Sequence, residues 1–216
     1  MIKSNLLIEN FKSKKDSFDE NFAIRIHRSL SWLKRSETEI NDIDAKFIFL
    51  WISFNANYSG LEGFSEKSYA QNIFNKFFEV LIENDLDRYI YDYIWKKFNT
   101  SIKSVLTNEF LLSSYWKFHH SNPKLWIEIY EKEKKIVNKA LSDSNSLSIL
   151  NILFDRLYVL RNQIFHGNAT WNSKINRKQL EQCTDLLSEI IPIFVVIMLE
   201  NPKVNWGELI VPVLSN

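Results

Sequence analysis

Residues that form tight turns are scarce in this chain of 216 residues, which contains only 4 Gly and 4 Pro. An average protein takes roughly 12% of its residues from these two types. β-Sandwiches and barrels need many tight turns, and phosphate-binding loops need closely spaced glycines. The sequence therefore excludes these architectures and predicts long helices joined by few connections.

The remaining composition predicts a folded chain without a strong overall charge. Hydrophobic residues make up 45% of the sequence and aromatic residues 14%, which is enough to build a packed core. The formal net charge is +1, so a polyanionic partner would have to bind a local basic patch. From the length and the absence of a low-complexity linker, we expect a single domain over residues 1–216.

Cysteine usage and hydropathy indicate a cytoplasmic protein. The single cysteine, Cys183, rules out an intrachain disulfide and is expected to be an inert packing residue. The N-terminus lacks the apolar run of a signal peptide. The longest uncharged apolar run, Ile190–Leu199, is about half of the ~20 residues that a membrane span requires. We therefore expect a soluble protein without a membrane segment.

Apolar residues recur at helical spacing along most of the chain. This periodicity predicts core helices over about residues 18–58 and 147–200, with a helical elaboration over about 65–141 between them. The stretch FIFLWISF, which begins at Phe47, is apolar nearly all round and is expected to run through the middle of the bundle. The residues after 200 are expected to dock as a short extended tail.

Several helix ends are marked by single residues. Asp42 or Asp44 is placed to cap the helix that contains FIFLWISF, and Gly60 and Gly63 are expected to end it. Gly167 follows the last long apolar helix before the C-terminal one, and it is expected to stop that helix.

One group of polar residues stands out, in the segment LYVLRNQIFHGNATW. Arg161 is followed directly by Asn162, and His166 comes four residues later, immediately before Gly167. An apolar helix leads into these residues and a glycine ends it. This pattern resembles the signature of the HEPN superfamily, in which an Arg, a polar residue and a His have this spacing near a helix end.

The resemblance implies an all-α, HEPN-like up-and-down helical bundle, here with extra helices inserted in the middle of the chain. It also implies a homodimer in which two copies of the motif face each other, and metal-independent cleavage of RNA. Arg161, Asn162 and His166 are then the catalytic residues, and no cofactor is expected. The stretch FLWISFNANYSG resembles the second helix of larger HEPN domains of toxin and abortive-infection type, so a toxin or phage-defence effector is expected.

The chemistry of these residue types fits cleavage of RNA. The 2′-hydroxyl is a built-in nucleophile, so the protein has only to move protons and stabilise the charge that grows on phosphorus. Histidine exchanges protons near neutral pH, and the arginine fork grips phosphate oxygens. On a helix, Arg161 and His166 lie about 140° apart, whereas Asn162 shares a face with His166 and can orient the imidazole or bind phosphate. A second copy of the chain is therefore expected to complete the site.

Residues just after the motif are candidates for binding the RNA. Lys174 and Arg177 can extend a phosphate-binding surface, and Trp171 can stack on a base. Each also has a simpler interpretation, because surface charge and packing account for most such residues.

Two other interpretations of the motif stay open. One is a catalytically inactive HEPN module that dimerises or docks on a partner such as a nucleotidyltransferase-like antitoxin. The net charge near zero favours this alternative, because a general RNA-degrading enzyme usually has a basic surface. The other is coincidence in an unrelated helical protein, with His166 stabilising a helix end and Arg161 paired with an acid such as Asp155 or Glu189.

Overall fold

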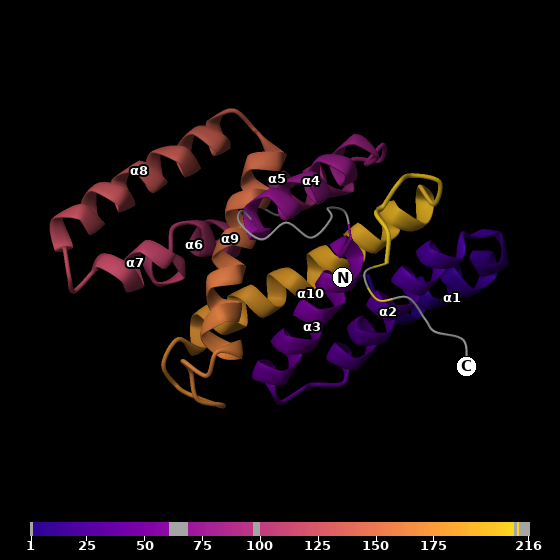
Figure 1. Ribbon diagram of the computed structural model, residues 1–216, viewed down its shortest axis with the longest axis horizontal. Helices are drawn as coiled ribbons and strands as arrows, with labels where there is room; N and C mark the ends of the chain where they lie inside the picture. Colours follow the sequence, from indigo (N-terminus) through magenta and orange to yellow (C-terminus); the bar gives the residue numbers. More distant parts are fainter. Residues whose placement is uncertain (1, 61–68, 97–99, 210, 212–216) are drawn as a thin grey trace. The chain divides into compact units, whose positions relative to one another are not determined.

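The regular structure of this chain is entirely helical within residues 2–60, 69–96, 100–209 and 211, which the computed structural model describes (Figure 1). The all-α prediction is therefore confirmed for these ranges. The helices, in chain order, are α1 (Ser4–Lys14), η1 (Lys15–Ser17), α2 (Glu20–Glu37), α3 (Ile43–Tyr58), α4 (Tyr69–Glu83), α5 (Tyr89–Lys96), α6 (Thr100–Leu106), η2 (Glu109–Leu111), α7 (Ser113–Phe118), α8 (Pro123–Ser142), α9 (Ser146–Phe165) and α10 (Arg177–Glu200). The predicted helix end at Gly63 lies outside the described residues.

Contacts along the chain define two compact units. Unit 1 consists of the N-terminal range Met1–Tyr89 and the C-terminal range Thr184–Asn216. Unit 2 consists of Ile90–Cys183. The boundaries between the units fall within α5 and α10. Helix α9, which carries the Arg161–His166 motif, therefore belongs to the same unit as α6, α7 and α8.

Unit 1 is built around α2 and α3, which pack side by side (Figure 1). Both helices begin at an aspartate: Asp19 accepts hydrogen bonds from the first turn of α2, and Asp42 accepts one from Ala45 N–H at 2.9 Å. The predicted cap at Asp42 is thus confirmed. These side-chain oxygens satisfy N–H groups that a helix start leaves without partners.

The core of unit 1 is aromatic. Phe54 of α3 is fully buried, and its ring lies within 6.4 Å, centroid to centroid, of rings from α4 and α10. These partners are Phe74, Phe77, Phe78 and Phe194. The expectation that FIFLWISF runs through the middle of a bundle is confirmed, because Phe47, Leu50, Trp51 and Phe54 are all at most 1% exposed.

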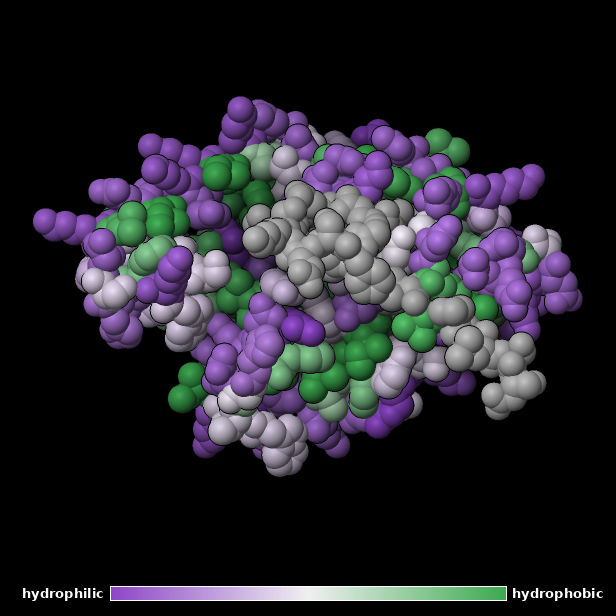
Figure 2. Space-filling model, in the orientation of Figure 1, coloured by the Kyte–Doolittle hydropathy of each residue, from purple (hydrophilic) through white to green (hydrophobic). Residues whose placement is uncertain are grey.

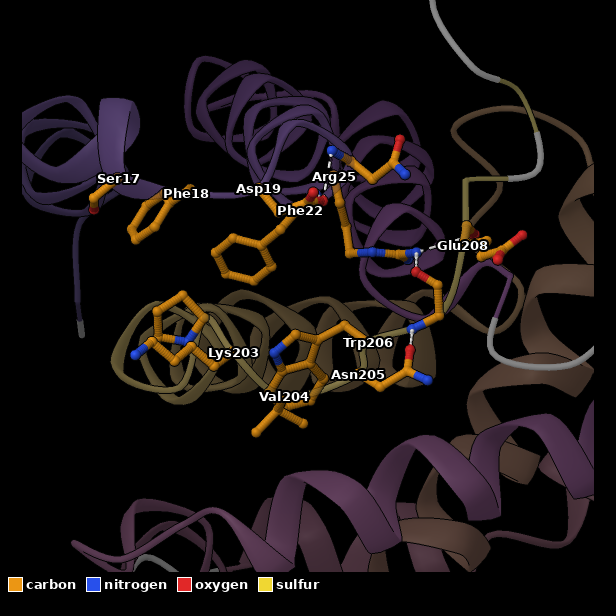
Figure 3. A pocket seen from close by; sticks show the side chains of 13 residues that line it. Ser17, Phe18, Asp19, Phe22, Arg25, Lys203, Val204, Asn205, Trp206 and Glu208 are labelled. Carbon is orange, nitrogen blue, oxygen red and sulfur yellow. Dashed lines mark hydrogen bonds between the residues drawn. The ribbon is translucent and has the colours of Figure 1, made fainter.

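Within unit 1, the C-terminal tail docks on α2 through a buried arginine, as Figure 3 shows. Arg25 of α2 is 1% exposed, and its two terminal nitrogens donate to backbone carbonyls at the end of α3 and in the tail. The acceptors are the carbonyls of Ala56 (3.3 Å), Asn57 (3.1 Å), Ser59 (2.6 Å), Gly207 (2.8 Å) and Glu208 (3.2 Å). The prediction that the tail docks is confirmed, because Trp206 is buried and the Gly207 and Glu208 carbonyls bind Arg25. Its first residues are not extended, since Val204 N–H donates to the Asn201 carbonyl in a turn.

Within the described ranges, no acidic side chain is as deeply buried as Arg25. Burial, together with repulsion from Arg28, lowers the pKa of Arg25 to about 10, so the guanidinium remains charged at neutral pH. The charge is stabilised by carbonyl dipoles, three of which come from the end of α3, where the helix dipole is negative.

Unit 2 packs α9 against α6 and α8. The inner face of α9 is apolar and fully buried at Leu150, Leu153 and Leu157. At its side, Arg156 donates from Nη2 to the Glu133 carboxylate of α8 at 2.8 Å. This packing fixes the helix that carries the motif.

By length and composition alone, α10 could cross a membrane. Its most apolar stretch is 72% buried within the protein, which is the environment of a core helix. The apolar character of α10 is therefore explained by packing.

Candidate functional site

Helix α9 ends at the histidine of the motif. His166 is the first residue beyond the helix, and Gly167 has a left-handed backbone, with φ of 70°. Gly167 N–H donates to the Ile164 carbonyl at 3.2 Å, and Asn168 N–H donates to the Gln163 carbonyl at 2.9 Å. This pair of bonds closes a helix that ends in a left-handed glycine. The predicted helix stop at Gly167 is confirmed.

The guanidinium of Arg161 is held by its neighbours on α9. Its Nη1 donates to Asn162 Oδ1 at 3.0 Å, and its central carbon lies over the Phe165 ring, 4.3 Å from the centroid. The Tyr158 ring is 6.0 Å away on the same measure. The Nε atom is buried and has no hydrogen-bond partner. The amide and the aromatic rings therefore restrain the position of a partly buried positive charge.

Arg161 forms no ion pair among the residues that the structure describes. The alternative of a structural pair with Asp155 or Glu189 is not seen in its contacts, which run to Asn162 and to the two rings. A guanidinium without a carboxylate partner has donors left for an anion, and phosphate oxygens fit its planar fork.

His166 is exposed, so its imidazole is open to a substrate. Its backbone N–H donates to the Asn162 carbonyl at 3.1 Å, which places the histidine one turn after the amide residue. The sequence predicts that Asn162 orients the imidazole or binds phosphate. In the structure its side-chain oxygen holds Arg161, so Asn162 links the two halves of the motif.

The other predicted site residues follow the motif in the chain. Trp171 is 72% exposed and Lys174 is exposed, both in the loop between α9 and α10. Arg177 begins α10, is half-buried, and donates from Nε to the Ser173 carbonyl at 2.9 Å. The contacts of Arg161 and His166 do not include these three residues, so the structure places them beyond the motif in the same unit.

The motif lies in the basic part of the chain. Unit 2 contains 14 Lys and Arg against 8 Asp and Glu, a formal charge of +6. The residues of unit 1 contain 13 Lys and Arg against 18 Asp and Glu, a formal charge of −5. The net charge of +1 is thus the sum of two opposite excesses, and the unit that carries Arg161 and His166 is suited to an anionic ligand.

Sequence reasoning missed a group of residues that lies beside the motif. Gln163, within the motif segment, donates from Nε2 to the Phe110 carbonyl of η2 at 3.4 Å. The same carbonyl accepts a hydrogen bond from Trp116 Nε1 of α7 at 2.9 Å. Phe110 and Trp116 are six positions apart, but Gln163 lies 53 positions from Phe110, so only the fold brings Gln163 to the other two.

Other features of the chain lie apart from the motif residues. Cys183 is fully buried, and burial raises the pKa of its thiol, as expected for an inert packing residue. A cavity of about 600 Å³, lined by η1, the start of α2 and the tail, belongs entirely to unit 1 (Figure 3). None of the predicted site residues lines it.

Two left-handed glycines provide a test of the tail and of the end of α9. At Gly60, with φ of 89°, an added Cβ would overlap the Glu208 carbonyl, whereas at Gly167 it would meet nothing within 4 Å. Gly60→Ala is expected to lower the free energy of unfolding by about 2–4 kcal/mol, because strain and overlap add. Gly167→Ala is expected to cost about 1 kcal/mol, from backbone strain alone. Urea denaturation measures both, and equal losses would contradict the close approach of the tail to Gly60.

No known protein family, curated protein sequence or solved structure matches the chain, so a functional assignment rests on its own residues and their geometry.

Proposed function

We propose that the chain is a metal-independent endoribonuclease of HEPN type. The observation that carries this proposal is the state of Arg161: its guanidinium is fixed by Asn162 and by the Phe165 ring, it has no carboxylate partner in the described part of the chain, and exposed His166 follows at the helix end. The charge of +6 on unit 2 adds support, because RNA is a polyanion.

Each residue of the motif has a distinct task in the proposed reaction. His166 exchanges protons with the 2′-hydroxyl or with the departing 5′-oxygen, since an imidazole has one nitrogen that can accept a proton and one that can donate it. Arg161 binds the non-bridging phosphate oxygens and stabilises the charge that develops on phosphorus. Asn162 positions Arg161. The 2′-oxygen attacks phosphorus and the bond to the 5′-oxygen breaks, which leaves a 2′,3′-cyclic phosphate and a 5′-hydroxyl.

A homodimer completes the proposed site. One general base and one general acid are needed, and each chain supplies a single motif histidine. His166 and most of the loop after it are exposed, which leaves this surface open to a second copy of the chain. The proposed place of action is the cytoplasm, where RNA is available. A role as a toxin or phage-defence effector is part of the proposal.

The inactive-module alternative draws its support from a net charge near zero. A net charge near zero disfavours RNA binding only where the charges are evenly spread, and here the motif unit carries a formal charge of +6. We therefore place the ribonuclease first, and docking on a nucleotidyltransferase-like antitoxin becomes the proposed means of restraining it.

The test uses purified protein, EDTA and a pair of oligonucleotides of one sequence. The first is RNA and the second carries 2′-deoxyribose at every position. We expect cleavage of the RNA alone, with 2′,3′-cyclic phosphate ends detected by mass spectrometry, because only RNA carries the nucleophile. No cleavage across several RNA classes, or equal cleavage of both strands, would overturn the proposal.

A further inference from the structure

Helix α7 and its surroundings form an aromatic surface in unit 2. Tyr115 is at its centre, with ring centroids at 5.0 Å from Phe110, 5.1 Å from Trp116, 4.4 Å from His119 and 5.2 Å from Trp126. We call Tyr115, Trp116, His119 and His120 the α7 aromatic surface. Its rings brace one another, so each is held in a defined orientation.

Trp116 presents the largest open ring of this surface. It is 53% exposed, yet its only polar side-chain atom, Nε1, is satisfied by the Phe110 carbonyl at 2.9 Å. Because Nε1 is bonded to the protein's own backbone, the part of the Trp116 ring that remains open to a ligand is apolar. The ring is already held in place before a ligand binds. Little side-chain conformational entropy is therefore lost when a flat ligand stacks on it.

The α7 aromatic surface is connected to the proposed active site. Gln163 and Trp116 donate to the same Phe110 carbonyl oxygen, at 3.4 and 2.9 Å. Gln163 precedes His166 by three residues, which corresponds to about one helical turn. Trp116 and the helix that carries the motif are therefore linked through one carbonyl oxygen of unit 2.

The charge around this surface suits a nucleic acid. Exposed Lys117 and Lys124 lie on α7 and at the start of α8, and unit 2 as a whole carries a formal charge of +6. Figure 2 shows green and pale side chains among purple ones over α7 and the start of α8, at the left of the view. Flat rings alternating with cations are the usual elements of a surface that binds single strands.

We propose that the α7 aromatic surface stacks unpaired bases of the RNA strand next to the cleaved bond, with Trp116 as the main platform. This inference rests on the proposed function, and it makes single-stranded RNA the substrate class. Bases in the interior of a duplex are already stacked on both faces, so they are not available to stack on Trp116. If Trp116 instead serves to bind a protein partner, replacing it will not change the affinity of the chain for RNA.

The test measures RNA binding without cleavage. The full chain carrying His166→Ala is titrated onto a fluorescein-labelled RNA of about 12 nucleotides, within the range that a single-strand binding surface covers, and onto the same RNA annealed to its complement. Fluorescence polarisation is the readout. Adding Trp116→Ala is expected to weaken single-strand binding about 5- to 100-fold, as loss of one stacked base does. Trp116→Phe is expected to retain most of the affinity, because it keeps a flat ring.

Trp32→Ala is the matched control, since Trp32 is 37% exposed and lies in unit 1. It is expected to leave binding unchanged. The inference fails if Trp116→Ala binds the single strand like Trp32→Ala, or if it loses duplex binding to the same extent. Circular dichroism checks folding. If Trp116→Ala does not fold, the test is photo-crosslinking of RNA containing 4-thiouridine to the His166→Ala chain. Absence of crosslinks in the peptide that contains Trp116 overturns the inference.

The two proposals fail separately. If the chain cleaves RNA but Trp116→Ala binds and cleaves single strands normally, the α7 aromatic surface has no role and the ribonuclease stands. If the chain binds single strands through Trp116 but cleaves no RNA, the ribonuclease fails and the binding surface stands.

Discussion

Replacing His166 by alanine is expected to lower RNA cleavage by about 10²–10⁴-fold, the usual contribution of a general acid or base. The histidine is exposed and lies beyond the last turn of α9, so the substitution removes no packing that the fold depends on. Stability in urea is therefore expected to stay within about 0.5 kcal/mol of the parent chain. The loss of rate is measured by single-turnover cleavage of the RNA oligonucleotide in EDTA.

Arg161→Lys tests whether the shape of the guanidinium, and not only its charge, is needed for cleavage. Lysine keeps the charge but lacks the fork that binds two oxygens and the planar group that lies over Phe165. We expect cleavage to fall strongly while RNA binding at low salt changes little, because charge dominates binding. Wild-type rates in both variants, or growth arrest on expression that survives His166→Ala, would show that the motif does not carry the activity.

Replacing Arg25 by alanine is expected to have the largest effect on stability, about 3–5 kcal/mol, comparable to removing one partner of a buried charged pair. The substitution leaves five backbone carbonyls without their donor, three at the end of α3 and two in the tail. Unsatisfied buried acceptors each cost free energy. The tail, which is also held by Glu208 N–H bonded to the Gly60 carbonyl at 3.2 Å, is expected to detach.

Arg28→Ala is the matched control, because Arg28 lies one turn further along α2 and is only half-buried. It is expected to change the free energy of unfolding by less than about 0.5 kcal/mol. Urea denaturation gives the stability, and hydrogen exchange of the 201–209 segment reports on the tail. Equal destabilisation by both substitutions, or unchanged exchange in Arg25→Ala, would show that Arg25 does not hold the tail.

Local features of the chain are predictable from sequence because their causes are local. Asp42 caps α3 through a bond to a residue three positions away, and Gly167 ends α9 because a left-handed backbone suits glycine. The all-α class follows from the scarcity of turn residues and from helical periodicity. The motif itself is contained in six consecutive residues, so its resemblance to the HEPN signature and its place at a helix end can both be recognised in the sequence.

The partners of those residues are not predictable in the same way. Whether Arg161 pairs with Asp155 or stays without a carboxylate depends on side-chain packing, and the structure places its guanidinium on Asn162 and Phe165. Buried Arg25 carries no signal in the sequence, because its acceptors are backbone carbonyls up to 183 positions away, and every residue has a carbonyl.

The sequence by itself determined that this protein is helical, where several of its helices begin and end, and which six-residue segment carries the candidate chemistry, because each depends on neighbours along the chain. Only the tertiary structure decided how the charge is divided, since a net +1 separates into +6 and −5 once contacts define the units. Only the tertiary structure placed Trp116 beside Gln163, because that neighbourhood depends on a shared carbonyl and on the packing of helices distant in sequence.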